Sequence, residues 1–306
     1  MALHLVPRSL QYFEHVAQLG SIQAASRELG ISASAIHRQI TAIEDSLGEQ
    51  LFDRDAKGMT LTSTGYLLLE LARDWRLDSA RLWSTMLTER GVEQGHIRLA
   101  AMDGMVNGFV PELVAEIARV LPRVQVDIKI TSPDNAVKEV LNGDVDIAAV
   151  VNVAPDDNLW FHWTRDFPLG CIATPSHAVA QRPNIGLSDL IEYPVVFQDS
   201  SLAIRKLLEA RHSWIFDRTK NSVVVNSIQL MKMLVGSGQY LAVTSELDAE
   251  PEIRSGRLKF IPISNEDVFR QKFSVISNLQ MPATTVISQV VALCVDILER
   301  RTVTVG

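Results

Sequence analysis

The chain has 306 residues, about twice a common domain length, so two or more domains are expected. With 47% hydrophobic and 21% charged residues, its composition excludes the collagen-like, low-complexity and largely disordered classes. The net charge is −7, and residues 1–90 carry nine Lys or Arg against eleven Asp or Glu, so neither part of the chain is basic. If the partner is DNA, its phosphates must be met by a few cations placed on one surface.

The lack of a recognisable targeting signal and the pattern of cysteines both favour a protein of the reducing interior of the cell. No apolar run approaches the roughly 18 residues of a membrane span, and the first residues lack the apolar core of a signal peptide. Cys171 and Cys294 belong to no CxxC pair and cannot form a disulfide framework of the secreted kind. We therefore expect a cytoplasmic protein without membrane contact, whose two thiols are buried.

Three short helices are predicted at the N-terminus. Apolar residues at helical spacing precede Gly20, and Ser21 is placed to cap a second helix that stops at Gly30. Ser32 then caps a third helix, in which the apolar positions are Ile36, Ile40, Ile43 and Leu47, and Gly48 ends it. Two short helices joined by a Gly-containing turn, with a preceding helix that completes a small core, predict a helix-turn-helix.

The other face of the third helix is polar and carries hydrogen-bonding side chains, namely Ser34, His37, Arg38 and Thr41. Such a face suits a major groove, although any solvated helix also shows polar residues there. The segment after Gly48 alternates apolar and polar residues around two cations, Arg54 and Lys57, which predicts a β-hairpin with a basic tip. A helix-turn-helix followed by such a hairpin is a winged helix, which favours DNA binding.

Residues 13–54, FEHVAQLGSIQAASRELGISASAIHRQITAIEDSLGEQLFDR, with LTSTG at 61–65, closely resemble the N-terminal signature of LysR-type transcriptional regulators. The match covers about fifty-five residues with near-complete spacing, and the length of the chain also suits that family. The resemblance implies that Ser32, Ser34, His37 and Arg38 face the groove and that Arg54 meets the DNA backbone. His37 departs from the family pattern, which usually has Ser there, so base preference is not transferred.

A single long helix is predicted over residues 62–90, with Thr62 as its N-cap. Apolar or small residues recur in heptads, as a helix-pairing seam requires; they are Leu68, Ala72, Trp75, Ser79, Leu82 and Met86. The alternative is that this face packs against its own domain. The family resemblance favours antiparallel pairing with a second chain, which would present two winged helices to two half-sites.

The remaining residues, 96–306, alternate short apolar strands with helices, which predicts parallel α/β sheets in two lobes. Strands are expected at 96–101, 124–130, 145–151, 168–174, 194–198, 222–226 and 240–244, with a strand near 268–276 that returns to the first lobe. Helices are expected at 105–121, 133–142, 201–212, 227–236 and 283–300. The resemblance implies a periplasmic-binding-protein-like effector domain. The predicted fold is thus α/β overall, with a winged helix-turn-helix (1–61), a linker helix (62–90), a hinge (91–95) and a two-lobed α/β domain (96–306).

Ligands of open α/β sheets bind beyond the carboxyl ends of the strands. Polar or flanking residues at those ends are the expected effector-binding residues: Met102, Asp103, Thr131, Ser132, Gln198, Asp199, Ser200, Asn226, Ser227 and Thr244. Each could instead be only a helix cap or a turn residue. Two of these residues are acids and none is Lys or Arg, which favours an effector that carries an amine. The competing interpretation is that Asp103 and Asp199 cap helices and point away from the cleft.

No catalytic or cofactor motif occurs in the sequence, which has no GxSxG, GxGxxG, P-loop or HExxH pattern. We therefore expect no enzyme, no cofactor and no metal. The aromatic residues Trp160, Phe161 and Trp163 could cover a ligand, but packing is the simpler interpretation. A transporter's solute-binding protein would need an export signal and no winged helix, and an α/β enzyme would need a catalytic pair in the cleft. We predict a transcriptional regulator that binds promoter DNA as a homodimer or homotetramer, responds to a small-molecule effector, and has RNA polymerase as a candidate partner.

Overall fold

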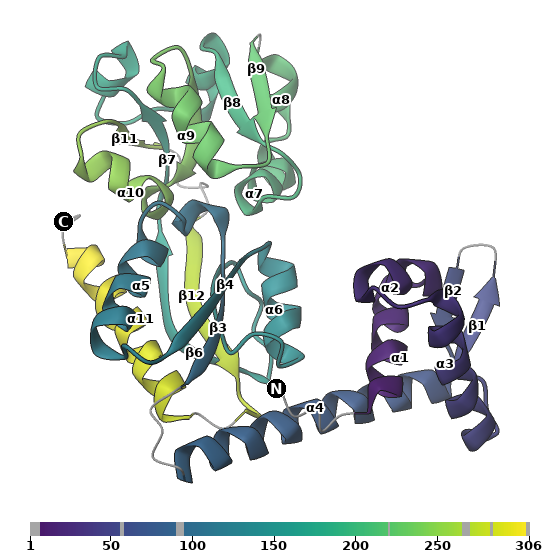
Figure 1. Ribbon diagram of the computed structural model, residues 1–306. Coiled ribbons are helices and arrows are strands. Elements are labelled where there is room, and N and C mark those ends of the chain that lie inside the picture. Colours follow the sequence, from purple (N-terminus) through teal and green to yellow (C-terminus); the bar gives the residue numbers. More distant parts are fainter. Residues whose placement is uncertain are drawn as a thin grey trace. The chain divides into compact units, whose positions relative to one another are not determined.

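The computed structural model describes residues 7–55, 58–89, 95–219, 221–264, 270–281 and 284–303. The chain divides into two compact units, Met1–Arg90 and Gly91–Gly306, which are described separately (Figure 1). Most of the predicted hinge, residues 91–94, lies outside the described residues. Among those that are described, no helix is long and apolar enough to cross a membrane.

The N-terminal unit consists of three short helices, a hairpin and a long helix. These are α1 (Arg8–Leu19), α2 (Ile22–Leu29), α3 (Ala33–Leu47), β1 (Phe52–Asp55), β2 (Gly58–Leu61) and α4 (Ser63–Glu89). The predicted caps form, since the Ser21 and Ser32 hydroxyl groups accept hydrogen bonds from the backbone N–H groups of Ala24 and Ala35. The apolar faces meet in one core that includes Phe13, Val16, Ala25, Ile36, Ile40 and Leu51.

The second unit has two lobes, and the first is built on a five-stranded sheet in the order β4-β3-β5-β12-β6. Its strands are β3 (His96–Ala101), β4 (Gln125–Ile130), β5 (Ile147–Val151), β6 (Leu159–Phe167) and β12 (Gln271–Asn278). The turn η1 (Asp103–Met105) and the helices α5 (Phe109–Val120), α6 (Pro133–Leu141) and α11 (Thr285–Val303) complete it. The expected parallel arrangement holds for β3, β4 and β5, but β12 is antiparallel to both β5 and β6, so the sheet is mixed.

The second lobe has a sheet in the order β11-β7-β10-β8-β9. Its strands are β7 (Leu169–Ala173), β8 (Val195–Gln198), β9 (Ser222–Val225), β10 (Leu241–Ser245) and β11 (Lys259–Pro262). Its helical elements are η2 (Ala178–Gln181), η3 (Leu187–Glu192), α7 (Ala203–His212), α8 (Trp214–Arg218), α9 (Ile228–Gly236) and α10 (Glu246–Arg254). Here too the sheet is mixed, because β7 runs antiparallel to β10 and β11.

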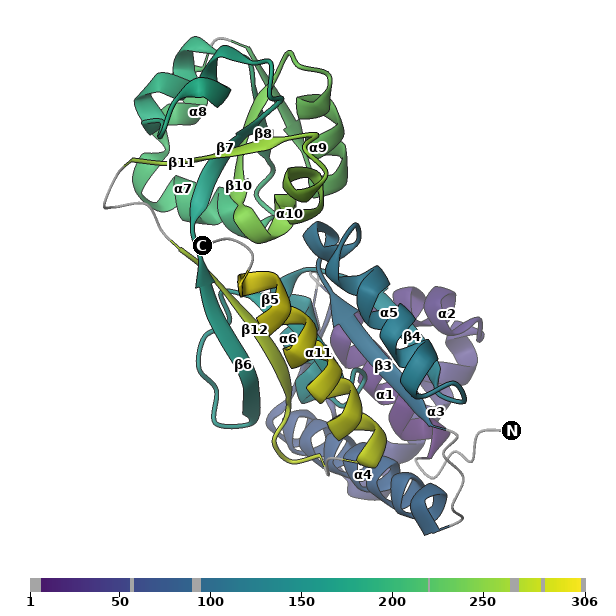
Figure 2. The same ribbon diagram turned by 90° about the vertical axis from the view of Figure 1, so that its left-hand side faces the viewer.

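The chain passes between the lobes twice, from β6 to β7 and from β11 to β12 (Figure 2). The aromatic cluster belongs to β6, which the sequence analysis did not predict as a strand. Trp163 is buried and packs edge-on against Phe273, whereas Trp160 is exposed. Packing is therefore the role of Trp163. Each lobe has apolar clusters around its own sheet, and Leu247 of α10 in the second lobe is buried within the main cluster of the first lobe.

Polar contacts join the two lobes, and the most concentrated is made by Asp103 of the first lobe. One oxygen of its carboxylate, Oδ2, accepts hydrogen bonds from Ser227 Oγ at 3.0 Å, from Gln229 N at 3.2 Å and from Ile228 N. The side-chain amide of Gln229 donates to the Asp103 carbonyl oxygen at 2.8 Å. A negative charge thus lies at the positive N-terminal end of α9, where free N–H groups need an acceptor.

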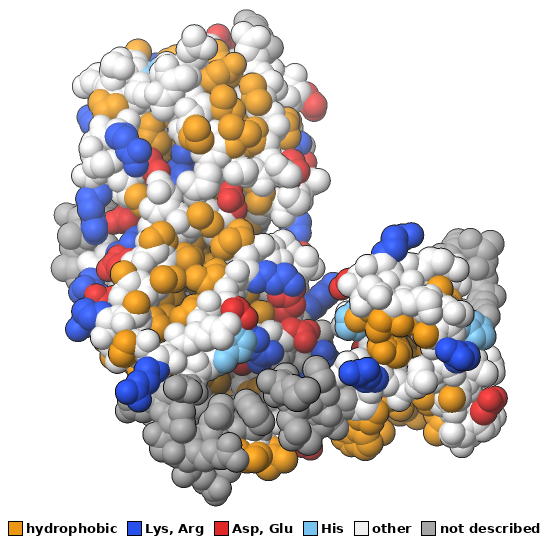
Figure 3. Space-filling view, in the orientation of Figure 1, with side chains coloured by type: hydrophobic (Ala, Val, Ile, Leu, Met, Phe, Trp, Pro, Cys, Tyr) orange, Lys and Arg blue, Asp and Glu red, His pale blue; other side chains and the backbone are white. Residues whose placement is uncertain are grey.

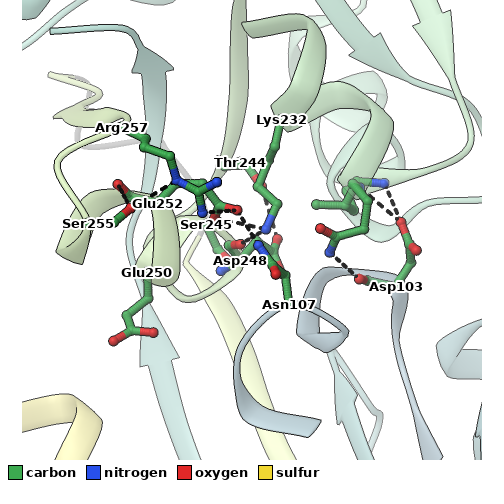
Figure 4. A network of polar contacts seen from close by, with 12 residues as sticks. Asp103, Asn107, Lys232, Thr244, Ser245, Asp248, Glu250, Glu252, Ser255 and Arg257 are labelled. Carbon is green, nitrogen blue, oxygen red and sulfur yellow. Dashed lines mark hydrogen bonds and ion pairs between the residues drawn. The ribbon is translucent and has the colours of Figure 1, made fainter. Parts of the chain in front are cut away.

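A second group of polar contacts surrounds the buried Lys232 (Figure 4). Its ammonium donates to Glu252 Oε2 and to the Asp248 carbonyl oxygen, both at 2.9 Å, within the second lobe. Asn107 of the first lobe donates its side-chain amide to Glu252 Oε1. Glu252, in the same lobe, therefore neutralises the charge of Lys232, and Asn107 adds a hydrogen bond to Glu252 from the first lobe. An isolated buried ammonium would be strongly destabilising.

Arg301, on α11 of the first lobe, forms the third contact between the lobes. Its guanidinium donates to Glu250 Oε2 of the second lobe at 2.7 Å and to Glu112 Oε2 of its own lobe at 2.6 Å. Lys206 of α7 also pairs with Asp134 of α6 at 3.0 Å, so charged and polar pairs hold the lobes together beside the apolar contact of Leu247. Such polar pairs depend on geometry more strongly than apolar packing does.

We predict that Asp103→Ala lowers the free energy of unfolding of the second unit by about 1 to 2 kcal/mol, the usual cost of removing a helix N-cap. The loss arises because the first N–H groups of α9 and the Ser227 hydroxyl lose their acceptor. Urea unfolding curves of the full chain measure it. Asp199→Ala is the matched control, because the Asp199 carboxylate bonds the nearby Ser201 and, within the described residues, makes no contact with the other lobe. Equal stability of Asp103→Ala and the wild type would contradict this role.

Candidate functional site

Four side chains expected to contact DNA lie on one face of α3. Ser34, His37 and Arg38 are exposed and Thr41 is half-buried, as their spacing of three, one and three residues requires. A contact of 3.3 Å between Thr41 Oγ1 and His37 Nδ1 connects two of them. Ser32 is also exposed, but its hydroxyl caps the helix by accepting from Ala35 N at 3.3 Å.

The hairpin packs beside this face through a backbone contact with the turn between α1 and α2. Met59 N donates to the Gly20 carbonyl oxygen at 2.9 Å. A Cβ atom at Gly58 would lie 2.8 Å from that oxygen, and the φ angle of +131° also requires glycine there. The Arg54 side chain and Lys57, both expected near the hairpin tip, lie outside what the structure describes.

A groove of about 490 Å³ runs between the hairpin, the start of α2 and the polar face of α3. It is lined by Gly20, Ser21, Ile22, Gln23, Ala33, Ser34, His37, Gly58 and Met59. Sequence reasoning did not include Ser21 and Gln23 among the candidate DNA contacts, because it considered only the third helix and the hairpin. Ser21 was predicted to cap the second helix, and the start of that helix lies beside the polar face of α3.

The acidic residues of this unit are partly accounted for by internal pairing. Glu14 is buried and accepts from an Arg76 guanidinium nitrogen at 2.7 Å. Glu44, on the buried side of α3, accepts from the Leu51 backbone N–H at 2.9 Å. In the view of Figure 3 the Lys and Arg side chains of this unit form separate patches. Two acids thus serve the fold instead of opposing the approach of phosphates.

Part of the predicted pairing seam on α4 packs inside its own unit. Ala72 is fully buried against Leu10, and Leu68 packs against the same cluster, so both side chains are used inside their own unit. Trp75 and Leu82 are 43% and 51% exposed, and Met86 is half-buried. The exposed apolar row continues through Leu67 and Leu71, which were not predicted. The heptad pattern did not show that α1 covers the Leu68 side of the helix.

A pocket of about 290 Å³ lies between the two lobes, where the predicted effector cleft was expected. Six of the ten expected residues line it, namely Met102, Asp103, Thr131, Ser132, Gln198 and Asn226. The other lining residues are Gly104, Ile130, Pro133, Val151, Ser201, Leu202, Ala203, Ile204, Ile228, Asp248 and Gln271. The six expected residues were identified because they lie at or just beyond the carboxyl ends of β3, β4, β8 and β9. The same reasoning could not identify Asp248, which lies on α10, or Gln271, which lies on the antiparallel β12.

Four expected residues do not line the pocket. Ser227 is the N-cap of α9, and Asp199 holds its own turn by accepting from the backbone and the hydroxyl of Ser201. Ser200 is exposed outside the pocket. Thr244 is fully buried and donates to Asp248 Oδ2 at 3.0 Å, so it orients a pocket residue without lining the pocket itself.

The two carboxylates that were expected to meet an effector amine already have partners in the chain. Asp103 is bonded to the start of α9 and Asp199 to Ser201. Asp103 thus caps a helix, as the competing interpretation held, but it lines the pocket instead of pointing away from it, and Asp199 holds a turn outside the pocket. The argument for an amine therefore loses its basis in Asp103 and Asp199.

Asp248 is the second carboxyl group that lines the pocket, and it is more deeply buried than Asp103. Burial raises the pKa of Asp248, which favours the neutral form. A Cβ atom at Gly104 would lie 2.1 Å from Asp248 Oδ1, so glycine is required where the first lobe meets this side chain. The pocket is therefore lined by the carboxyl groups of Asp103 and Asp248 among neutral hydrogen-bonding groups.

The two cysteines are buried, as expected. Burial raises the pKa of Cys171 and of Cys294 to about 12, so both remain thiols at neutral pH and neither is a nucleophile. Among the residues that the structure describes, no group of three or more His, Cys, Asp or Glu side chains could hold a metal ion.

Both units match known protein families. Residues 7–66 match the model for "Bacterial regulatory helix-turn-helix protein, lysR family", and residues 90–299 match that for "LysR substrate binding domain". The RuBisCO operon transcriptional regulator of Allochromatium vinosum is 26% identical over 274 residues, which cover 89% of this chain and 90% of that protein. The transcriptional regulator CbbR of Rhizobium meliloti (strain 1021) is 27% identical over 278 residues, covering 90% and 88% respectively.

Solved structures share the fold. A full-length OxyR variant from Pseudomonas aeruginosa has a TM-score of 0.64 at 15% identity and covers 96% of this chain and 95% of that one. Full-length CbnR in complex with its target DNA has a TM-score of 0.54 at 21% identity, with coverage of 96% and 99%. The named relatives are transcriptional regulators and not enzymes. The chain belongs to the LysR family of bacterial regulatory helix-turn-helix proteins, and it is a DNA-binding transcriptional regulator with an effector-binding domain.

Proposed function

We propose that the polar face of α3 reads promoter DNA and that a small molecule in the pocket between the lobes changes how tightly the chain binds it. The observation that carries the first part is the exposure of Ser34, His37 and Arg38 on one helix face beside the packed hairpin. A helix of this kind fits the major groove, where an Arg guanidinium can bond a guanine edge with two hydrogen bonds. Ser32 and Thr41 flank these residues, and Arg54 and Lys57 are proposed to meet phosphates.

The second part is supported by the way in which the lobes are joined. The pocket is lined from both lobes, and charged or polar pairs join the lobes near it. A ligand that bonds both lobes would favour the lobe arrangement it fits best, and the change in affinity for DNA would follow from that preference. RNA polymerase is the proposed partner through which DNA binding alters transcription.

We also propose that the chain works as a homodimer or homotetramer. Leu67, Leu71, Trp75 and Leu82 leave an apolar row exposed on α4, as a helix that pairs with a second copy would. In the second unit, exposed apolar side chains also lie on the edge strands, Ile128 and Ile130 on β4 and Val224 on β9 (Figure 3). Paired chains would present two copies of α3 to two half-sites.

We predict that Arg38→Ala weakens binding to a DNA sequence selected by the wild type from a random pool by about 1 to 3 kcal/mol, the scale of one bidentate base contact. Binding to unselected DNA should change less, because phosphate contacts remain. Fluorescence anisotropy at several salt concentrations measures both affinities. Gln39→Ala, an exposed neighbour outside the polar face, should bind as the wild type does. Unchanged binding of Arg38→Ala to the selected DNA would refute the proposed role of α3.

Trp75→Glu should shift the protein from dimer to monomer at micromolar concentration, since a carboxylate in a helix-pairing seam must lose its hydration. Sedimentation velocity reports the change directly. The same substitution at Trp160, the exposed tryptophan on β6, serves as the control and should leave the oligomer intact. If Trp75→Glu sediments as the wild type does, the exposed row of α4 is not the pairing surface.

A further inference from the structure

The imidazole ring of His37 is held on the polar face of α3 by a contact within the same helix. Its Nδ1 atom lies 3.3 Å from Thr41 Oγ1, at a spacing of four residues that places the two side chains one above the other. Thr41 is half-buried, and its β-branched side chain has few rotamers, so its hydroxyl group is a firm support. The ring is therefore oriented before DNA arrives, which lowers the entropy lost on binding.

His37 also borders the groove between α3, the start of α2 and the hairpin. Of the described residues that line this groove, none is Lys, Arg, Asp or Glu. Phosphates are met mainly by cations, whereas base edges are also read by uncharged donors and acceptors, so the lining suits base edges. Arg38 is exposed but is not part of the lining, because successive residues of a helix point about 100° apart. The two side chains therefore meet different base pairs.

The contact with Thr41 bears on which hydrogen-bonding group the ring presents. A neutral imidazole carries one N–H group and a protonated imidazole carries two. Nε2 carries a hydrogen when the Thr41 hydroxyl group donates to Nδ1 of the neutral ring, and also when the ring is protonated. The negative potential of DNA favours a donor at its surface. Nε2, the ring nitrogen farther from the backbone, therefore acts as a hydrogen-bond donor.

Guanine is the base that suits such a donor best. In the major groove it presents two neighbouring acceptors, N7 and O6. Adenine also has N7, but the amino group beside it is a donor and opposes another donor. Cytosine presents an amino group, and thymine presents its single acceptor beside a methyl group. A donor that is held in one orientation therefore selects guanine.

We propose that His37, oriented by Thr41, reads a guanine of the DNA half-site by donating from Nε2 to the guanine N7 atom. This inference rests on the proposed function of α3 and adds to it a residue that determines sequence specificity. Thr41 is a positioning residue, since it acts through the ring of His37. The guanine is not the base that Arg38 contacts, so each half-site contains one further base pair that the chain reads.

The test replaces each guanine of the DNA selected by the wild type, one at a time, with 7-deazaguanine, which pairs normally but lacks N7. Fluorescence anisotropy with the full chain gives the affinity for each DNA. At one guanine of the half-site the replacement should weaken wild-type binding by about three- to tenfold, the scale of one hydrogen bond. In His37→Ala the same replacement should cause no further loss. The slope of affinity against salt should be that of the wild type, because no phosphate contact is removed.

Arg38→Ala is the matched control, because Arg38 is exposed on the same helix and next to His37. It binds the selected DNA more weakly but should keep the full loss at the guanine assigned to His37. Thr41→Val, which has nearly the shape of threonine without the hydroxyl group, should reduce that loss to about twofold or less. Thr41→Ser, which keeps the hydroxyl group, should restore it. Packing alone would not distinguish the two variants in this way.

The assignment would be overturned by a wild type that is sensitive at no guanine, or by equal sensitivity of the wild type and His37→Ala at every guanine. A smaller salt slope in His37→Ala, with equal losses on selected and unselected DNA, would overturn it too, since that pattern indicates a phosphate contact. Wild-type behaviour of Thr41→Val would remove the positioning role. If Arg38→Ala still loses affinity for the selected DNA in these cases, the role of His37 is wrong and the proposed function of α3 stands. If the wild type selects no sequence, both are wrong.

Discussion

The carboxylate of Asp103 at the start of α9 is the interaction on which the arrangement of the effector-binding domain depends. Each lobe has its own sheet and apolar clusters, and Leu247 of the second lobe packs into the cluster of the first. The polar contacts that join the lobes include Asp103 to α9, Asn107 to Glu252, Arg301 to Glu250 and Lys206 to Asp134. Directional contacts of this kind can be rearranged at less cost than an extensive close-packed core. This is the property that a ligand-responsive domain requires.

The two helix starts at the cleft differ in how their N–H groups are met. The start of α9 is filled by the chain's own acid, whereas α7 has no side-chain cap. In the DNA-binding unit, the acids Glu14 and Glu44 are likewise bonded within the fold.

The sequence was sufficient to predict features set by local chemistry. Ser21 and Ser32 were predicted as helix caps, and Gln198 and Asn226 were found because strands end just before them. The sequence was insufficient where packing between segments that are distant along the chain determines the structure. Leu68 and Ala72 fit a heptad, but α1 covers them, and Gln271 reaches the pocket on a strand that runs against the parallel order. The sequence shows that Asp103 is an acid, but its partner Ser227 lies more than a hundred residues away along the chain and could not be predicted.

Hydrogen exchange resolved to single amides in the full chain, without added ligand, is the most direct test of the difference between the two helix starts. The N–H groups of Ile228 and Gln229 should exchange slowly, because Asp103 accepts their hydrogen bonds. Those of Ala203 and Ile204, at the uncapped start of α7, should exchange quickly. Fast exchange at Ile228 and Gln229, or equal protection at both helix starts, would contradict an arrangement in which Asp103 holds the start of α9 and no side chain caps α7.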